Sequence, residues 1–310
     1  MAMFFAVVYS SKYNVDIGPH VMRTEKYRLV MNRLLEELKL NSREILEPKT
    51  PADGALKSAL DASYYDDLKN ARQTWRTISS ELPISRTIIE TAFLCVGGTI
   101  LAAEEALHRH GIIFHDGGGW HHAFPNHSEG FCYVNDVAVA VQDLKRRQMI
   151  RRAMVVDLDL HQGNGTAVYF QNDPDVFTFS MHQDQLYPQK QRSDLDIPLV
   201  NFTTDSSYMR LLSTAIPRIY DEHQPDIIFY IAGADPYMDD QLGSLSLTIE
   251  GLRKRDEVVL SEAANRQIPV VITLAGGYAI DLKDTVEIHV NTAKVAHEIA
   301  ARYQAPIPAQ

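Results

Sequence analysis

The chain has 310 residues, of which 45% are hydrophobic and 23% are charged, and its formal net charge is −10 at pH 7. Such an acidic chain lacks the wide basic surface that nucleic-acid binding requires, and the apolar run at residues 4–8 is too short to cross a membrane, so we expect neither partner. Two cysteines, Cys95 and Cys132, cannot form a disulfide framework, which predicts a reducing compartment and a cytoplasmic location.

Short apolar runs alternate with longer helical patterns along the chain, and no repeat, low-complexity tract or Ser/Gly-rich linker interrupts them. We therefore predict one α/β domain over residues 1–310, with three layers, α-β-α, around a central, mostly parallel sheet. In chain order, the predicted strands are residues 4–8, 111–114, 153–158, 176–180, 226–231 and 269–274. The predicted helices are residues 25–38, 87–108, 135–147, 166–171, 207–223, 248–266 and 282–303. Segment 41–83 contains Pro48, Pro51 and Pro83 and is expected to be the least regular part of the chain and to fold over the surface.

The segment 155–165, VVDLDLHQGNG, has the pattern of a buried strand that stops in a glycine loop. Alternate side chains of an extended chain share a face, so we expect Asp157, Asp159 and His161 to point together to the carboxyl end of the strand, where open α/β sheets bind ligands. Two adjacent carboxylates repel each other and are costly to bury, and a cation removes that cost. Asp plus His is a ligand set that zinc accepts, whereas a helix-capping aspartate accounts for only one of the three residues. The segment therefore predicts a metal site.

Other predicted strands also end in small residues followed by a functional side chain. His121 and His122 follow a glycine-rich loop after the second predicted strand, Asp235 follows the fifth, and Tyr278 follows the sixth. Because the carboxyl ends of parallel strands meet at one edge of a sheet, these endings predict one shared site.

Asp235 is the best candidate for a third metal ligand, and the alternative is a turn aspartate before Pro236. Three protein ligands leave an open position for water and substrate, which is typical of catalytic zinc. Such an ion lowers the pKa of its bound water to roughly 7 and polarises a carbonyl group.

Hydrolysis also needs a proton shuttle, and the adjacent His121 and His122 fit that role. Asp157 and Asn164 can each accept a hydrogen bond from an imidazole, which fixes the tautomer and the basicity of a histidine. Tyr278 is a candidate donor of a hydrogen bond to an oxyanion, although a tyrosine at a strand end also occurs for packing alone.

These residues resemble those of the zinc-dependent histone deacetylases, which have the arginase/deacetylase fold, and the resemblance covers most of the chain. It rests on six strings in this order: GGT at 97–99, GGGWHH at 117–122, GFCYVND at 130–136, the segment 157–166, AGAD at 232–235 and GGY at 276–278. The strings at 159–165 and 240–243, DLHQGNG and DQLG, most resemble class IV members and their bacterial relatives.

The resemblance implies hydrolysis of the amide in N-acylated lysine side chains, with acetyl or longer fatty acyl groups. It implies that Asp159, His161 and Asp235 bind one zinc ion. It further implies a role for each catalytic residue: His122 as general base, His121 as its electrostatic or acid partner, Asp157 and Asn164 as the respective partners of His121 and His122, and Tyr278 as the clamp on the acyl carbonyl.

The resemblance also implies a narrow tunnel for the acyl-lysine stem, lined by Gly130 and Phe131, with Tyr187 on the opposite wall. A structural monovalent cation, K⁺, is implied near Asp157, Asp159, His161, Ser180 and Met181.

Two departures from the class I pattern affect these expectations. Asn164 stands where class I members have aspartate, so we expect a lower pKa for His122. No counterpart of the rim aspartate that grips the substrate backbone is found, so acetylated polyamines or other small acylated amines stay an alternative to acyl-lysine peptides and proteins. The sequence leaves the physiological metal, zinc or ferrous iron, and the oligomeric state open.

Overall fold

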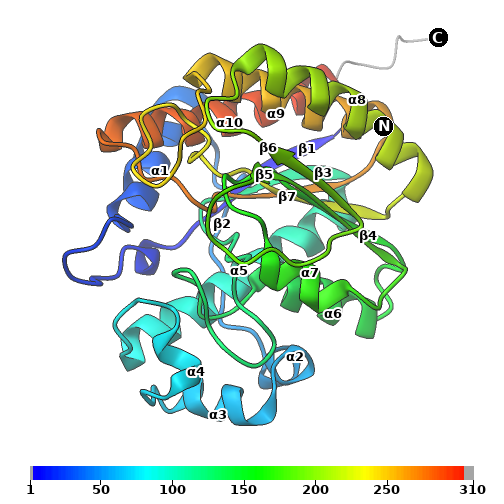
Figure 1. Cartoon of the computed structure of the whole chain (residues 1–310). Coiled ribbons are helices and arrows are strands. Elements are labelled where there is room, and N and C mark those ends of the chain that lie inside the picture. The colour runs from blue at the N-terminus through cyan, green and yellow to red at the C-terminus, as the bar shows by residue number, and fades with distance from the viewer. Residues whose placement is uncertain (1–2, 304–310) are drawn as a thin grey trace.

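The computed structural model describes residues 3–303 and places eight parallel strands in one sheet, in the order β2-β1-β3-β8-β7-β4-β5-β6 (Figure 1). The strands are β1 Phe4–Val8, β2 Ile45–Leu46, β3 Gly111–His115, β4 Ala153–Asp157, β5 Val176–Gln183, β6 Leu195–Leu199, β7 Ile227–Ile231 and β8 Val270–Thr273. The predicted α-β-α architecture is confirmed, and all the described strand pairs are parallel rather than mostly so.

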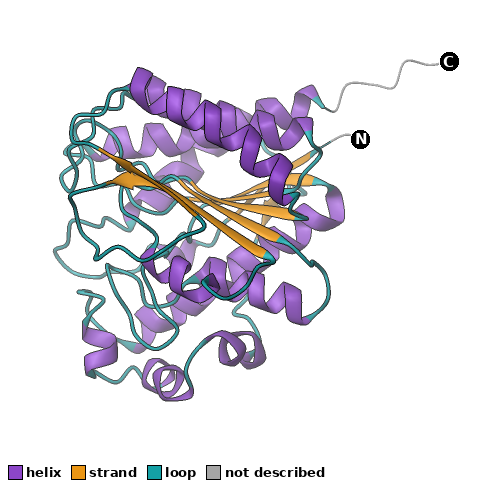
Figure 2. Cartoon of the chain, turned by 45° about the vertical axis from the view of Figure 1, so that its right-hand side comes forward, coloured by secondary structure: helices purple, strands orange, loops and turns teal. Residues whose placement is uncertain are grey.

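Helices cover both faces of the sheet. They are α1 Glu25–Leu38, α2 Asp53–Ala59, α3 Ala62–Lys69, α4 Trp75–Ile78, α5 Arg86–Arg109, α6 Asp136–Arg146, α7 Asn164–Phe170, α8 Asp205–His223, α9 Ile249–Asn265 and α10 Leu282–Arg302, with a short 3-10 turn at Ser11–Tyr13. Figure 1 shows α8, α9 and α10 on one face and α5, α6 and α7 on the other, and Figure 2 shows the strands between these two layers.

The two faces are covered because the strands are apolar on both sides. In β4, Met154 and Val156 pack into the core under α8 to α10, whereas Ala153 and Val155 pack into the core under α5 and α6. A parallel sheet buried on both faces needs such continuous apolar runs, and this is why the central strands could be predicted.

The long helix α5 contributes to the hydrophobic core on the face of the sheet that α5 and α6 cover. Its first turn is capped by Ser85, whose hydroxyl accepts a hydrogen bond from the Ile88 amide. Among the described helices, α5 is the one with the length and hydropathy of a membrane span, but 78% of that apolar stretch is buried inside the protein. Its composition is therefore accounted for by packing in the core.

The sequence missed several elements and misplaced one strand end. Segment 41–83, expected to be the least regular part, contains the unpredicted elements β2, α2, α3 and α4. The edge strand β6 was also missed. Its exposed Pro198 and half-buried Asp196 do not give an apolar run, and its pairing with β5 depends on contacts distant in sequence. Finally, β4 ends at Asp157, so Asp159 and His161 lie in the following loop and not on the strand.

The neighbouring strands β4 and β7 lie at a topological switch point of the sheet, where the strand order along the chain reverses. From β4 the chain proceeds outward to β5 and β6 and then returns to β7 on the opposite side of β4. The crevice beyond the carboxyl ends of two such strands is where open α/β sheets bind ligands. The loops after β4 and β7 form the site described next.

Candidate active site

Two carboxylates and one imidazole converge beyond the carboxyl ends of β4 and β7. One ligand atom from each of Asp159, His161 and Asp235 lies within 4.8 Å of the others, and all three residues are buried. Nδ1 of His161 lies 3.3 Å from a carboxylate oxygen of Asp159 and 3.3 Å from Oδ2 of Asp235. This donor set and spacing fit a divalent ion such as Zn²⁺.

Backbone amides orient the two carboxylates. Asp235 accepts a hydrogen bond from the Leu160 amide through Oδ1 at 2.9 Å, whereas no donor among residues 3–303 makes a well-formed hydrogen bond to its buried Oδ2, from which Nδ1 of His161 lies 3.3 Å away. Asp159 accepts from the amides of His161 and Gly276, each at 2.9 Å. A buried carboxylate oxygen without a donor is costly, so the free Oδ2 is the observation that fits a cation at this point.

Glycines make room for this group. A Cβ at Gly276 would clash with Oδ2 of Asp235 and lie 2.7 Å from Oδ2 of Asp159. A Cβ at Gly233 would lie 2.5 Å from Asp159 and 2.7 Å from Asp235. The small residues recognised after the predicted strands therefore let the backbone of two loops pass directly behind the carboxylates.

Two of these three side chains have raised pKa values. Burial opposes a charge on His161, but the adjacent carboxylates of Asp159 and Asp235 outweigh it and raise its pKa to about 10. Burial and the charge of Asp159 raise the pKa of Asp235 to about 6. A metal ion and these protons therefore compete for the same atoms.

The two adjacent histidines line the same cavity and differ in their partners. Oδ2 of Asp157 lies 2.7 Å from Nδ1 of His121, and burial is outweighed by Asp157 and Asp159, which raise the pKa of His121 to about 9. Burial and the positive charges of His121 and His161 lower the pKa of His122 well below its usual value. At neutral pH, His121 is an imidazolium and His122 is a neutral base.

Asn164 is the partner of His122. Its amide oxygen lies 2.8 Å from Nδ1 of His122, at the start of α7. The resemblance implied both pairings, His121 with Asp157 and His122 with Asn164, and the structure brings each pair into hydrogen-bond distance.

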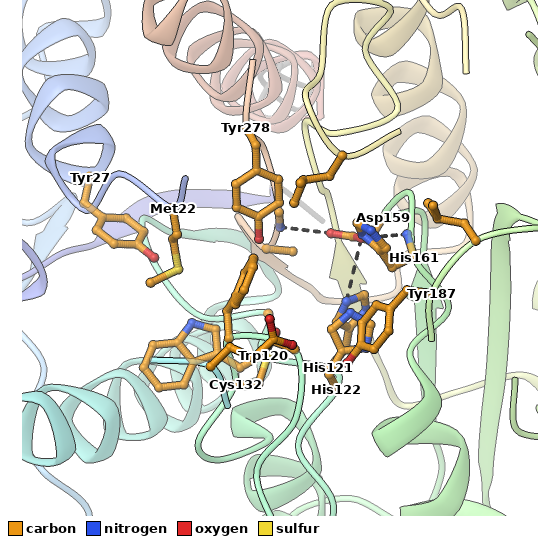
Figure 3. A pocket seen from close by; sticks show the side chains of 18 residues that line it. Met22, Tyr27, Trp120, His121, His122, Cys132, Asp159, His161, Tyr187 and Tyr278 are labelled. Atoms are coloured by element: carbon orange, nitrogen blue, oxygen red, sulfur yellow. Dashed lines mark hydrogen bonds and ion pairs between the residues drawn. The ribbon is translucent and has the colours of Figure 1, made fainter. Parts of the chain in front are cut away.

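Tyr278 completes the side of the cavity opposite the histidines. Its hydroxyl end points into the cavity that His121, His122 and Tyr187 also line (Figure 3). Burial, followed by the negative charges of Asp235 and Asp159, raises its pKa well above the usual value, so the hydroxyl stays protonated and can donate. Its backbone amide donates to Asp240 at 2.7 Å, which holds the loop after β8 in place.

The cavity has a volume of about 300 Å³ and a largely apolar wall. The resemblance implied that Gly130, Phe131 and Tyr187 form this wall, and all three line the cavity. Phe131 packs edge-on against Tyr278, with ring centroids 5.9 Å apart. The other apolar side chains of the wall are Met22, Tyr27, Trp120, Leu186 and Leu242.

Three residues of the site were missed in the sequence. Glu129 accepts a hydrogen bond from Asn164, exposed Glu81 lines the cavity, and buried Arg255 donates to the carbonyl oxygen of Gly233 at 2.6 Å. Whether Glu81 takes the place of the rim aspartate of class I members stays a prediction, because its exposed side chain is one of the residues that line the cavity. A single glutamate or arginine carries no sequence signal of this kind. The expected K⁺ position stays a prediction, although β4 and β5 do pair Asp157 with Ser180.

Comparison with known proteins decides the family. The model of the histone deacetylase domain matches residues 20–293. This chain belongs to the histone deacetylase family. It is 37% identical to an uncharacterised protein of Picosynechococcus sp., over 96% of this chain and 100% of that protein.

Other relatives match this chain over most of their length. Histone deacetylase 2 of Arabidopsis thaliana is 30% identical over 88% of this chain and 74% of its own length. A probable deacetylase of Archaeoglobus fulgidus is 30% identical over 90% of this chain and 82% of its own length. The HD domain of HDA15 has the same fold, with a TM-score of 0.81 at 19% identity, over 97% of this chain and 92% of that one. Family membership supports a hydrolase of the deacetylase type.

Proposed function

We propose that this histone deacetylase family member removes acyl groups from lysine side chains by zinc-dependent hydrolysis. The observation that carries the proposal is the convergence, at one cavity, of the Asp159–His161–Asp235 group, two histidines with opposite pKa shifts and a tyrosine hydroxyl. The free Oδ2 of Asp235 supports a bound cation. Zn²⁺ held by these three side chains would supply a Lewis acid that polarises the acyl carbonyl and acidifies water.

The two histidines divide the proton transfers between them. His122 is neutral. Its Nδ1 faces Asn164, so its other ring nitrogen, Nε2, accepts the proton of the attacking water as general base. His121 is held as an imidazolium by Asp157 and supplies charge stabilisation and a proton for the leaving amine. Neighbouring groups whose pKa values are pushed apart suit such an acid–base pair.

Tyr278 stabilises the developing oxyanion. Its phenol stays protonated because burial and two carboxylates oppose ionisation, so it donates a hydrogen bond when negative charge forms on the acyl oxygen.

The cavity wall favours an aliphatic substrate. Phe131, Tyr187 and Leu186 present carbon surface along a cavity of about 300 Å³ with the polar group at its base. Such a shape accepts the methylene stem of an acyl-lysine and excludes water around it. Acceptance of fatty acyl chains and assignment to class IV stay predictions.

A second candidate substrate is a small acylated polyamine. The exposed carboxylate of Glu81 at the cavity favours it, because a polyamine carries ammonium groups beyond the amide to be cleaved. On a peptide, the same carboxylate would accept a backbone N–H. Glu81→Gln should weaken polyamine turnover far more than peptide turnover if polyamines are the substrates.

The test is a deacylation assay with protein stripped of metal and then loaded with zinc or ferrous iron. Acyl-lysine peptides of increasing chain length and acetylated polyamines are compared. Release of carboxylate and free amine that depends on the ion supports the proposal. Binding of acyl-lysine without turnover in every metal state would contradict it and favour an acyl-lysine reader.

A further inference from the structure

Glu129 connects two side chains of the site that belong to different elements. Its Oε1 accepts a hydrogen bond from Nδ2 of Asn164 at 2.7 Å and another from the hydroxyl of Tyr187 at 3.0 Å. The loop that carries it is fixed by two backbone hydrogen bonds with Cys132, at 3.1 and 2.9 Å. Its other oxygen lies 3.6 Å from Nε2 of His127.

The charge of Glu129 restricts the orientation of Asn164. Partial burial would raise the pKa of Glu129, but hydrogen bonds from His127, Asn164 and Tyr187 outweigh it and hold the pKa below its usual value. An ionised carboxylate only accepts hydrogen bonds. Asn164 must therefore turn its NH₂ group to Glu129, which leaves its amide oxygen facing His122.

The orientation of Asn164 in turn decides the tautomer of His122. An amide oxygen accepts, so Nδ1 of His122 must carry the hydrogen across the 2.8 Å contact. In the neutral ring, Nε2 is then the unprotonated nitrogen and can accept a proton. If the amide were reversed, its NH₂ would face Nδ1 and the hydrogen would move to Nε2, where a general base cannot have it.

We propose that Glu129 is a positioning residue that selects the base-competent tautomer of His122 by fixing the amide orientation of Asn164. The proposal rests on the assignment of His122 as general base under Proposed function. Asparagine needs such a neighbour because its two ends have almost the same shape but opposite hydrogen-bonding character, whereas an aspartate offers an acceptor in either orientation.

A double-mutant cycle tests this dependence on the holoenzyme. Glu129→Gln keeps the shape but gives Asn164 a partner that can donate or accept, so we expect kcat to fall on the order of 10–100-fold, the range for lost orienting contacts, with KM changed less than about threefold. In the Asn164→Asp background the same substitution should leave kcat unchanged or raise it, because it separates two carboxylates. An equal loss in both backgrounds would overturn the proposal, since a merely structural glutamate is damaging in both.

A spectroscopic measurement separates this inference from the function on which it rests. ¹⁵N spectra of histidine-labelled, zinc-loaded protein report which ring nitrogen of His122 carries hydrogen. We expect hydrogen on Nδ1 in the unmodified protein and in Tyr187→Phe, which removes the other hydrogen bond to Oε1, and a shift toward Nε2 in Glu129→Gln. If the spectra change as expected but the protein cleaves no acyl amide, the proposed deacylase function is refuted, whereas the role of Glu129 in setting the tautomer of His122 is supported. Identical His122 spectra in an active enzyme and its Glu129→Gln variant would refute the inference alone.

Discussion

Oδ2 of Asp157 lies 2.7 Å from Nδ1 of His121, and both side chains are almost completely buried. The neighbouring ring of His122 is only 4.1 Å away between centroids but faces a neutral amide instead. Asp157 and Asp159 outweigh burial and raise the pKa of His121 to about 9, whereas burial and the positive charges of His121 and His161 lower the pKa of His122 well below its usual value. The difference is a property of the partners, because both rings are equally buried.

Asn164→Asp should move the acidic limb of the pH–rate profile. A carboxylate facing Nδ1 of His122 stabilises the imidazolium and raises the pKa of that ring by about 1 unit or more. The base is then lost at higher pH, so the limb of kcat/KM moves upward. A pH–rate series on both proteins measures it, and an unmoved limb would contradict the role of His122 as base.

Tyr278→Phe should lower kcat by roughly 10²–10³-fold, the range observed when one donor to an oxyanion is removed. KM should change little, because the hydrogen bond strengthens only as charge develops on the acyl oxygen. Steady-state kinetics and metal analysis check this together. A variant with full kcat would show that the phenol at the cavity wall is there for packing.

Gly276→Ala should impair metal binding without a change at any ligand. The added Cβ would clash with Asp235 and press on Asp159, so we expect metal affinity to fall on the order of 10–100-fold, as when the surroundings of a ligand are disturbed.

Gly54→Ala is the matched control, because a Cβ at that exposed position of α2 meets nothing within 4 Å. It should leave metal affinity unaltered. Equal metal affinity in both variants would show that the two carboxylates do not hold the ion.

Metal affinity should fall as the pH falls. His161, with a pKa of about 10, must lose a proton to bind, so affinity drops roughly tenfold for each pH unit between 9 and 6. Below about pH 6, Asp235 is also protonated and the slope approaches two protons for each ion. Calorimetric zinc titrations in buffers of different ionisation enthalpy count the released protons. Binding without proton release near pH 7 would contradict this assignment.

The central strands could be predicted because each is buried on both faces and therefore consists of an unbroken apolar run. β4 and β7 are such runs, and the change from apolar to acidic residues at their ends marks Asp159 and Asp235. Two short strands were missed because they lack an unbroken apolar run. β2 has two residues, and β6 is held by its pairing with β5 rather than by its own sequence pattern.

The residues of the site also fall into those that the sequence could predict and those that it could not. Asp159, His161 and Asp235 could be grouped from the sequence because the carboxyl ends of parallel strands share one edge. Glu129 could not, since nothing in the sequence places it beside Asn164, which is 35 positions away.

The order of residues along the chain determined the layered fold, the family and the kinds of side chain at the site, since those follow from apolar periodicity and from motifs adjacent in sequence. Only the tertiary structure decided that Glu129 lies beside Asn164, that Glu81 lines the cavity, and which backbone amides hold the carboxylates of Asp159 and Asp235. Such contacts join loops that lie far apart in the chain, and a hydrogen bond depends on ångström-scale placement that local sequence does not specify.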